Sequence, residues 1–148
     1  MKRFRIIIFC LYSLAGCAVL QSQPDRTEIP TELSNSLSAD IVQHLQNLYP
    51  PAQTQFNIVQ PVPETDHFGA SLVFELREKG YAVQSYDAER PEGADNGLDF
   101  SYTVDRPVSD LFKGLYRVQL RVGKTILTRA YTADNNTVNP AGAWSKLE

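Results

Sequence analysis

Few residues in this sequence have the type and spacing that catalysis requires. The two histidines, His44 and His67, have no cysteine or serine nucleophile at a recognisable spacing, so each is expected to face solvent. Ser71 follows Gly69-Ala70, but its flanks differ from the Gly-x-Ser-x-Gly turn that exposes a nucleophilic serine. The sequence has no phosphate-binding loop and no dinucleotide-binding fingerprint. Nucleophilic and nucleotide-dependent catalysis are therefore disfavoured.

Acidic side chains offer only weak alternatives. Glu75, Glu78 and Asp99 could in principle act as general acid and base, but the sequence does not place them together. Asp95-Asn96-Gly97 and Asp134-Asn135-Asn136 resemble fragments of calcium loops, yet they lack the spaced acidic ligands and the closing glutamate, so turns are expected. Two histidines and two cysteines disfavour a His/Cys metal site. We therefore expect no enzyme, no catalytic residue, no metal and no cofactor other than a covalent lipid.

That lipid is predicted at Cys17. The segment Leu14-Ala15-Gly16-Cys17 matches the lipobox of bacterial lipoproteins, in which the cysteine becomes the lipidated first residue of the mature protein. A positive stretch, residues 1–5, and an apolar stretch, residues 6–14, precede it. The apolar stretch is shorter than the roughly 20 residues of a membrane span, and the order of the two is typical of a signal peptide. The alternative is an ordinary signal peptide with a chance cysteine nearby.

Lipidation would explain the use of cysteine in this chain. Cys10 would leave with the signal peptide, residues 1–16, so the mature domain would contain neither a free thiol nor a disulfide. Lipoproteins of this type resemble one another in carrying several acyl chains, which together anchor stably. Ala18 is not the aspartate that acts as an inner-membrane retention signal in many enteric-type bacteria. By that resemblance we expect the periplasmic face of the outer membrane.

The charge balance argues against direct binding of nucleic acid. The chain has 14 basic and 17 acidic residues, and three of the basic ones lie in the signal segment. Removing those three from 14 leaves 11 basic against 17 acidic residues, a formal charge of about −6. Sequence-independent nucleic-acid binding usually requires a basic stripe that displaces counterions from phosphate.

Beyond the signal peptide, the pattern predicts a tether and one folded domain. Residues 17–37 are polar, with turn formers and no sustained period, and we expect a flexible tether. The domain would occupy residues 38–148. Its first helix would be capped by Ser36 or Ser38, with an apolar face of Leu37, Ile41, Leu45 and Leu48. A second helix would begin at the cap Asp66 and end at Gly80.

Five strands are predicted around these helices, at residues 55–60, 81–86, 98–104, 116–122 and 125–131. The last two would form a hairpin through Gly123-Lys124, which sets Leu120 opposite Leu127 and Tyr116 opposite Tyr131. The predicted fold class is α+β: a two-layer sandwich with two helices packed on one face of a mostly antiparallel sheet of four to five strands.

The hairpin register places two arginines on the sheet face away from the core. Arg117 and Arg121 would stand there beside Ile126 and Ala130. Because arginine is enriched in interfaces, this face is a candidate partner site, although a solvated face is an equal alternative.

Two further residues have alternative placements. Arg129 would share the inward side, so it would lie at the sheet edge or meet a carboxylate. Trp144, the single tryptophan, would staple the C-terminal tail to the core or stay exposed as an anchor for a neighbouring subunit.

An ordered set of short motifs resembles the TrbH family of conjugal transfer lipoproteins. The most telling are Leu48-Tyr49-Pro50-Pro51-Ala52, Gly80-Tyr81-Ala82-Val83, Leu115-Tyr116-Arg117-Val118, Arg129-Ala130-Tyr131 and the ending Pro140-Ala141-Gly142-Ala143-Trp144. Residues 87–97 and 105–114 do not align with the family pattern. Cys17 is the one functional residue that this resemblance transfers.

The resemblance implies a structural part of a type IV secretion system, which moves plasmid DNA between bacteria. Its expected partners are the outer-membrane and periplasmic subunits of the secretion channel, with the membrane contacted through the lipid and no direct contact with nucleic acid. The alternative is another envelope-assembly or lipid-transport accessory lipoprotein. A hydrophobic ligand pocket would favour transport, and a filled core with an exposed sheet face or edge would favour docking.

Overall fold

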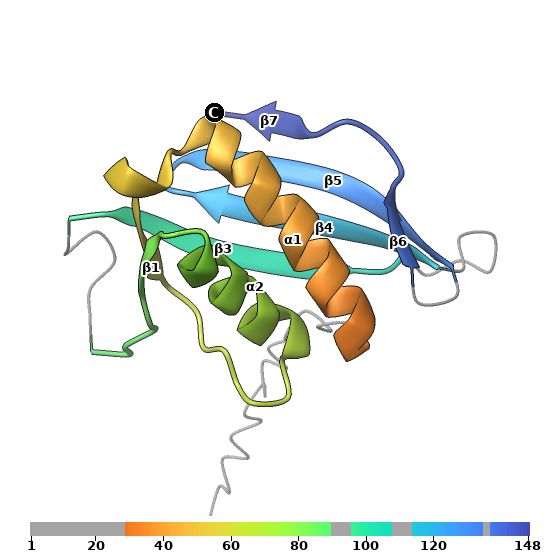
Figure 1. The fold of residues 1–148 in the computed structure, drawn as a ribbon, viewed down its shortest axis with the longest axis horizontal. Helices are drawn as coiled ribbons and strands as arrows, with labels where there is room; N and C mark the ends of the chain where they lie inside the picture. The colour runs from red at the N-terminus through yellow and green to blue at the C-terminus, as the bar shows by residue number, and fades with distance from the viewer. Residues whose placement is uncertain (1–28, 90–95, 108–113, 135–136) are drawn as a thin grey trace, which may run out of the picture.

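The computed structural model describes residues 29–89, 96–107, 114–134 and 137–148. Its two helices, α1 (Thr31–Leu48) and α2 (His67–Glu78), lie side by side over one face of a sheet (Figure 1). The strands are β1 (Gln55–Ile58), β2 (Ala82–Gln84), β3 (Leu98–Asp105), β4 (Leu115–Val122), β5 (Thr125–Asp134), β6 (Thr137–Pro140) and β7 (Ser145–Leu147). A short 3₁₀ turn, Pro51–Gln53, joins α1 to β1.

The sheet is mixed and mostly antiparallel. Its strand order is β2-β1-β3-β4-β5-β6, and β7 pairs with β5 as well. Strand β1 runs parallel to both β2 and β3, whereas the remaining pairs are antiparallel. The predicted α+β class is confirmed. The predicted count of four to five strands is too low, because β6 and β7 were not predicted. Both are short segments that pair with different parts of the long strand β5, and neither has a sequence alternation of its own that would indicate a strand.

The central hairpin has the predicted register. Leu120 lies opposite Leu127 and Tyr116 opposite Tyr131. Gly123 in the turn has φ +58°, a left-handed conformation that glycine adopts without steric cost. In this register, every second side chain of β4 points into the core.

The core fills the space between the helices and the sheet. Phe56 of β1 lies at its centre, with ring centroids 4.9 Å from Tyr81 and 5.1 Å from Phe100. Burying an aliphatic or aromatic side chain of this size contributes about 1.5–3 kcal/mol. The fully buried large side chains are Tyr131, Phe56, Phe100, Leu37, Ile41, Leu45, Leu72, Leu76, Leu120, Leu127, Val42 and Val118. The opposite side of the sheet, here called the open face, is covered by no helix among the described residues (Figure 1).

Helix α1 begins earlier than predicted. It starts at Thr31 and not after a cap at Ser36 or Ser38, since Pro30 is the N-cap residue. Ile29 and Leu33 extend the buried stripe towards the N-terminus, so packing stabilises the extra turns. The last residues of the predicted tether, 31–37, therefore belong to this helix. The signal peptide, the lipobox and residues 17–28 of the predicted tether lie outside the described residues.

Helix α2 has the predicted boundaries and cap. The Oδ1 atom of Asp66 accepts a hydrogen bond from the Gly69 backbone N–H at 2.8 Å, and its Oδ2 atom accepts one from the Tyr102 hydroxyl at 2.7 Å. Asp66 therefore fastens the start of α2 to strand β3. Gly80 follows the helix with φ +87°.

Candidate functional site

The residues that could have been catalytic are not brought together. His67 is exposed at the start of α2, as predicted. The Ser71 hydroxyl donates a hydrogen bond to Oδ1 of Asn35 at 2.9 Å, so this serine joins the two helices. Glu75 and Glu78 lie on α2, whereas Asp99 lies on β3, on the open face.

Metal-binding geometry is likewise not seen among the described residues. No group of three or more His, Cys, Asp or Glu side chains in that part of the chain could hold a metal ion. Asn96 and Asp134 are exposed, and their neighbours Asp95, Asn135 and Asn136 lie outside the described residues.

His44 is half-buried in a ring stack, whereas the prediction had it facing solvent. Its ring stacks on the Trp144 indole, with centroids 4.7 Å apart and planes inclined by 6°. Burial in this stack lowers the pKa of His44, and the nearby charge of Arg129 lowers it further, while Asp40 acts in the opposite direction. The prediction was wrong because the stacking partner is a residue 100 positions further along the chain.

Arg129 meets a carboxylate, which was one of its two predicted placements. Its Nη1 atom donates to Oδ2 of Asp40 at 3.0 Å, and the Tyr131 hydroxyl donates to the same oxygen at 2.8 Å. The Arg129 Nε–H also binds the carbonyl of Gly142 at 2.8 Å. Burial, and then the hydrogen bond to Asp40, raise the pKa of Tyr131 well above its ordinary value. These contacts fasten α1 and the C-terminal segment to β5.

Trp144 has the staple arrangement and not that of an exposed anchor. It is partly buried against the core, with its ring 6.4 Å from Tyr131, and its Nε1–H has no hydrogen-bond partner among the described residues. Together with the Arg129 contacts, the tryptophan holds the C-terminal segment against α1.

The open face carries the predicted arginines. Arg117 lies opposite Ala130, and Arg121 lies opposite Ile126. Arg117 is bound to Asp105 on the neighbouring strand β3, and this hydrogen bond raises the pKa of Arg117. No hydrogen bond or ion pair joins Arg121 to another described residue, so its charge remains available.

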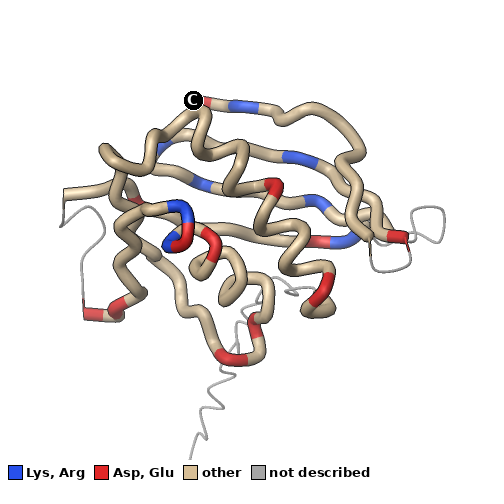
Figure 2. Tube along the Cα trace, viewed as in Figure 1, with Lys and Arg blue, Asp and Glu red and all other residues tan. Residues whose placement is uncertain are grey.

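Next to Arg121 the open face is apolar. Ile126 lies between Arg121 and Leu147 of β7, and Leu147 is 65% exposed. We call these three residues the sheet-face patch. The tube drawing in Figure 2 shows that the strands of this region carry much of the positive charge, whereas acidic residues dominate the helices and the loops around them.

A second surface, which the sequence did not predict, lies beside α2. A pocket of about 580 Å³ opens between the outer side of this helix and the ends of β1 and β2. Phe74 and Tyr86 line it and are 61% and 40% exposed. We call this the α2 pocket; its full lining is Ile58, Pro61, Val62, Pro63, Ala70, Val73, Phe74, Arg77, Ser85 and Tyr86.

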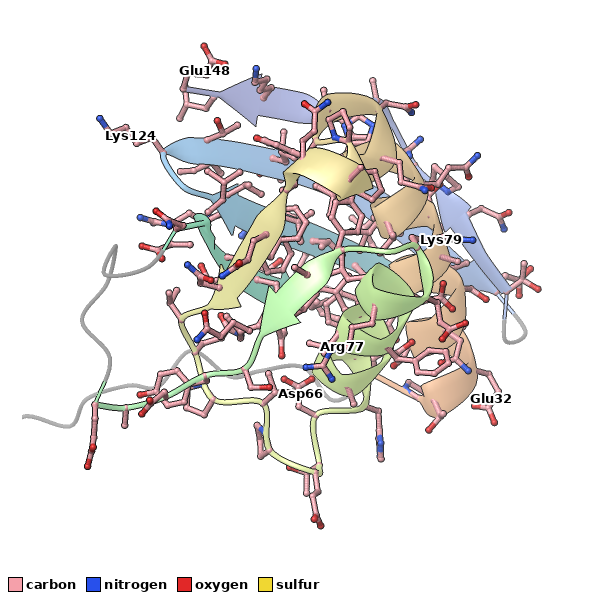
Figure 3. All side chains as sticks on the ribbon, turned by 60° about the vertical axis from the view of Figure 1, so that its left-hand side comes forward. Glu32, Asp66, Arg77, Lys79, Lys124 and Glu148 are labelled. Carbon is pink, nitrogen blue, oxygen red and sulfur yellow. The ribbon has the colours of Figure 1, made fainter. Side chains whose placement is uncertain are left out.

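Arg77 is the one basic or acidic side chain among the described residues that line the α2 pocket, and Figure 3 labels it. Its Nη2 atom donates to the Val83 carbonyl and to the Ser85 hydroxyl, both at 3.3 Å. Arg77 therefore supports the wall at the end of β2. The sequence contained one signal for the pocket, because Phe74 departs from the stripe Phe68, Leu72 and Leu76 that faces the core.

None of the helices in the described ranges is both long enough and apolar enough to cross a membrane. Cys17 and the lipobox residues Leu14, Ala15 and Gly16 lie outside these ranges, and their predicted role stays a prediction.

Comparison with known proteins identifies a family. The family model described as "Conjugal transfer protein TrbH" matches residues 17–148. No curated protein and no solved structure matches the chain. The family match spans most of the chain and includes every described helix and strand. The chain therefore belongs to the TrbH family of conjugal transfer proteins.

Proposed function

We propose that this chain is an outer-membrane lipoprotein that acts as a structural component of a conjugative type IV secretion system. A lipid on Cys17 would fix it to the periplasmic face of the outer membrane. The α+β domain would then dock on larger subunits of the channel. In this role the protein assists assembly and makes no direct contact with the transferred DNA.

The observation that carries this proposal is the start of the family match. The TrbH match begins at residue 17, which is the cysteine that the lipobox predicts as the first residue of the mature protein. The start of the family match and the lipobox thus divide the chain at the same residue. This agreement supports removal of residues 1–16 and a functional role for all that follows.

Docking is supported by the open face. Arg121, which forms no hydrogen bond or ion pair with another described residue, stands beside Ile126 and the exposed Leu147. Arginine next to apolar side chains is a common composition for a protein interface. By contrast, Arg117 is held by Asp105, which makes it the weaker contact of the two predicted arginines.

Lipidation is tested by metabolic labelling with a palmitate analogue in the native host. The wild type should take up the label and fractionate with the outer membrane, whereas a Cys17→Ser variant should do neither. Cys10→Ser is the matched control, since that cysteine lies in the segment predicted to be removed, and it should label normally. An equal label in the Cys17→Ser variant would overturn the assignment of the lipid.

Partnership is tested by crosslinking and affinity purification from host membranes, with a tag after Glu148. The tagged wild type must first transfer plasmid normally. Large channel subunits should co-purify with it and be reduced with Cys17→Ser. Normal transfer by a Cys17→Ser variant that has left the outer membrane, or recovery of the bait without channel subunits, would contradict the proposed role.

The α2 pocket favours a second candidate function. An apolar pocket of about 580 Å³ has the size range of a small-molecule site, so an envelope accessory that carries a lipid is the alternative. Mass spectrometry of organic extracts distinguishes the two functions. A stoichiometric lipid that is lost in a Phe74→Lys variant, yet retained in Cys17→Ser, would support transport.

A further inference from the structure

Three of the exposed large apolar side chains among the described residues lie at two separated places on this domain, and Leu48, at the end of α1, lies at neither. Among the described residues four large apolar side chains are exposed, namely Leu48, Phe74, Tyr86 and Leu147. Phe74 and Tyr86 both line the α2 pocket, and Leu147 belongs to the sheet-face patch. Since an exposed apolar cluster is costly for a protein in water, each place is a candidate for a partner.

The charges around the two places are opposite. Glu64 follows the pocket residue Pro63, and Asp87 and Glu89 follow the pocket residue Tyr86. Figure 2 shows acidic residues in the loops that adjoin α2. The pocket also contains the exposed cation Arg77, whose hydrogen bonds go to the uncharged Val83 carbonyl and Ser85 hydroxyl, so the acidic residues in these loops outnumber one retained positive charge.

The sheet-face patch has the complementary charge. Arg121 has no partner among the described residues, and the exposed Lys124 lies in the adjoining turn (Figure 3). The flanking charges of Leu147 cancel, because Lys146 forms an ion pair with Glu148. Asp99 of β3 lies on the same face, so Arg121 and Lys124 together leave a net positive charge beside the apolar side chains of the patch.

The two places also lie at opposite edges of the sheet. The α2 pocket adjoins β2, the first strand in the sheet order, whereas Leu147 is on β7, which pairs with β5 at the other side. Figure 1 shows β7 and α2 on opposite sides of the molecule. One copy could therefore use both places at once without the neighbours colliding.

We propose that the sheet-face patch of one copy docks into the α2 pocket of a second copy. Ile126 and Leu147 enter the pocket, and Arg121 meets the acidic loops that carry Glu64 and Glu89. A cavity of about 150 Å³ already holds a benzene molecule, so about 580 Å³ has room for both side chains. Such a contact joins different surfaces of the two copies, and it therefore propagates into a ring or a filament instead of stopping at a dimer.

The test measures the mass of the detergent-solubilised full chain by light scattering over a range of concentrations. The wild type should grow beyond a dimer as the concentration rises. Arg121→Glu and Phe74→Lys should each weaken association by at least about tenfold, because each removes a central contact of one surface. The matched controls are Lys79→Glu and Glu78→Gln, which make the same charge changes at the C-terminal end of α2 and outside the pocket lining, and they should associate like the wild type.

Mixing the two defective variants gives the decisive result. Each copy keeps one intact surface, so an equimolar mixture of Arg121→Glu and Phe74→Lys should form a dimer that does not grow further. A wild type that stays monomeric, a wild-type dimer that never grows, or a mixture without dimers would overturn the inference. The inference shares the sheet-face patch with the docking described under the proposed function, but it uses neither the lipid anchor nor DNA transfer. Its failure would therefore leave the patch free for a channel subunit, and the labelling and crosslinking tests of the proposed function would be unaffected.

Discussion

Replacing Gly69 with alanine should destabilise the domain, although glycine-to-alanine changes inside helices usually stabilise by up to about 1 kcal/mol. Gly69 lies in the first turns of α2, directly against β3. A Cβ atom there would lie 1.8 Å from the Tyr102 hydroxyl oxygen, 2.7 Å from Tyr102 Cζ and 2.9 Å from Asp66 Oδ2. Distances this short are not tolerated, so the tyrosine ring must move.

The cost follows from what that movement breaks. Tyr102 is 4% exposed, and its hydroxyl donates to the Asp66 carboxylate that also caps α2. Losing a hydrogen bond to a charged group costs about 1.5–3 kcal/mol, and an off-rotamer side chain costs about 0.5–1.5 kcal/mol. Subtracting the helix gain of about 1 kcal/mol leaves a net loss of about 1–3.5 kcal/mol for Gly69→Ala.

Urea unfolding followed by circular dichroism measures this loss in the free energy of unfolding. Gly142→Ala is the control, because no atom lies within 4 Å of its added Cβ, and it should change stability by less than about 0.5 kcal/mol. The cost of Gly69→Ala should shrink in a Tyr102→Phe background, where the colliding hydroxyl is absent. A Gly69→Ala variant as stable as the wild type would refute the collision and the role of Tyr102 in holding the cap.

Three further changes test other parts of the structure. Asp40→Asn should lower the free energy of unfolding in urea by about 1–3 kcal/mol, because Arg129, whose side chain is 18% exposed, loses its charged partner; an unchanged midpoint would contradict this. The lowered pKa of His44 means that, as the pH falls below 6.5, the unfolded chain takes up a proton more readily than the folded chain. Stability present above pH 6.5 is therefore lost on acidification, and His44→Tyr, which keeps an aromatic ring there, should lose less; parallel pH profiles would contradict the assignment. Gly114→Ala should destabilise more than Gly123→Ala in thermal melts, since both have positive φ but only at position 114 would the Cβ strike a backbone oxygen, at 2.7 Å. Equal shifts in Tm would show that the backbone at Gly114 relaxes freely.

The central strands could be predicted from the sequence because their alternation is set locally. Residues of β4 alternate between buried and exposed positions, and the two-residue turn at Gly123 then fixes the pairing of Leu120 with Leu127. Contacts between distant segments could not be predicted in this way. The sequence indicated that Arg129 needs a carboxylate, but only the packing of α1 on the sheet selects Asp40.

Two residues break the hydrophobic pattern of their helices in opposite ways, and the structure gives them different roles. Ser34 is a polar residue in a buried stripe, and the chain satisfies its hydroxyl internally through the Pro30 carbonyl at 3.0 Å. Its polarity hid the true start of α1 from the sequence. Phe74 is the opposite case, because it is an apolar residue on α2 whose side chain remains 61% exposed in the folded domain. A buried polar residue such as Ser34 finds its hydrogen-bond partner within the folded chain. An apolar residue that folding leaves exposed can be buried only by a partner, and for this reason we place one of the self-association surfaces at Phe74.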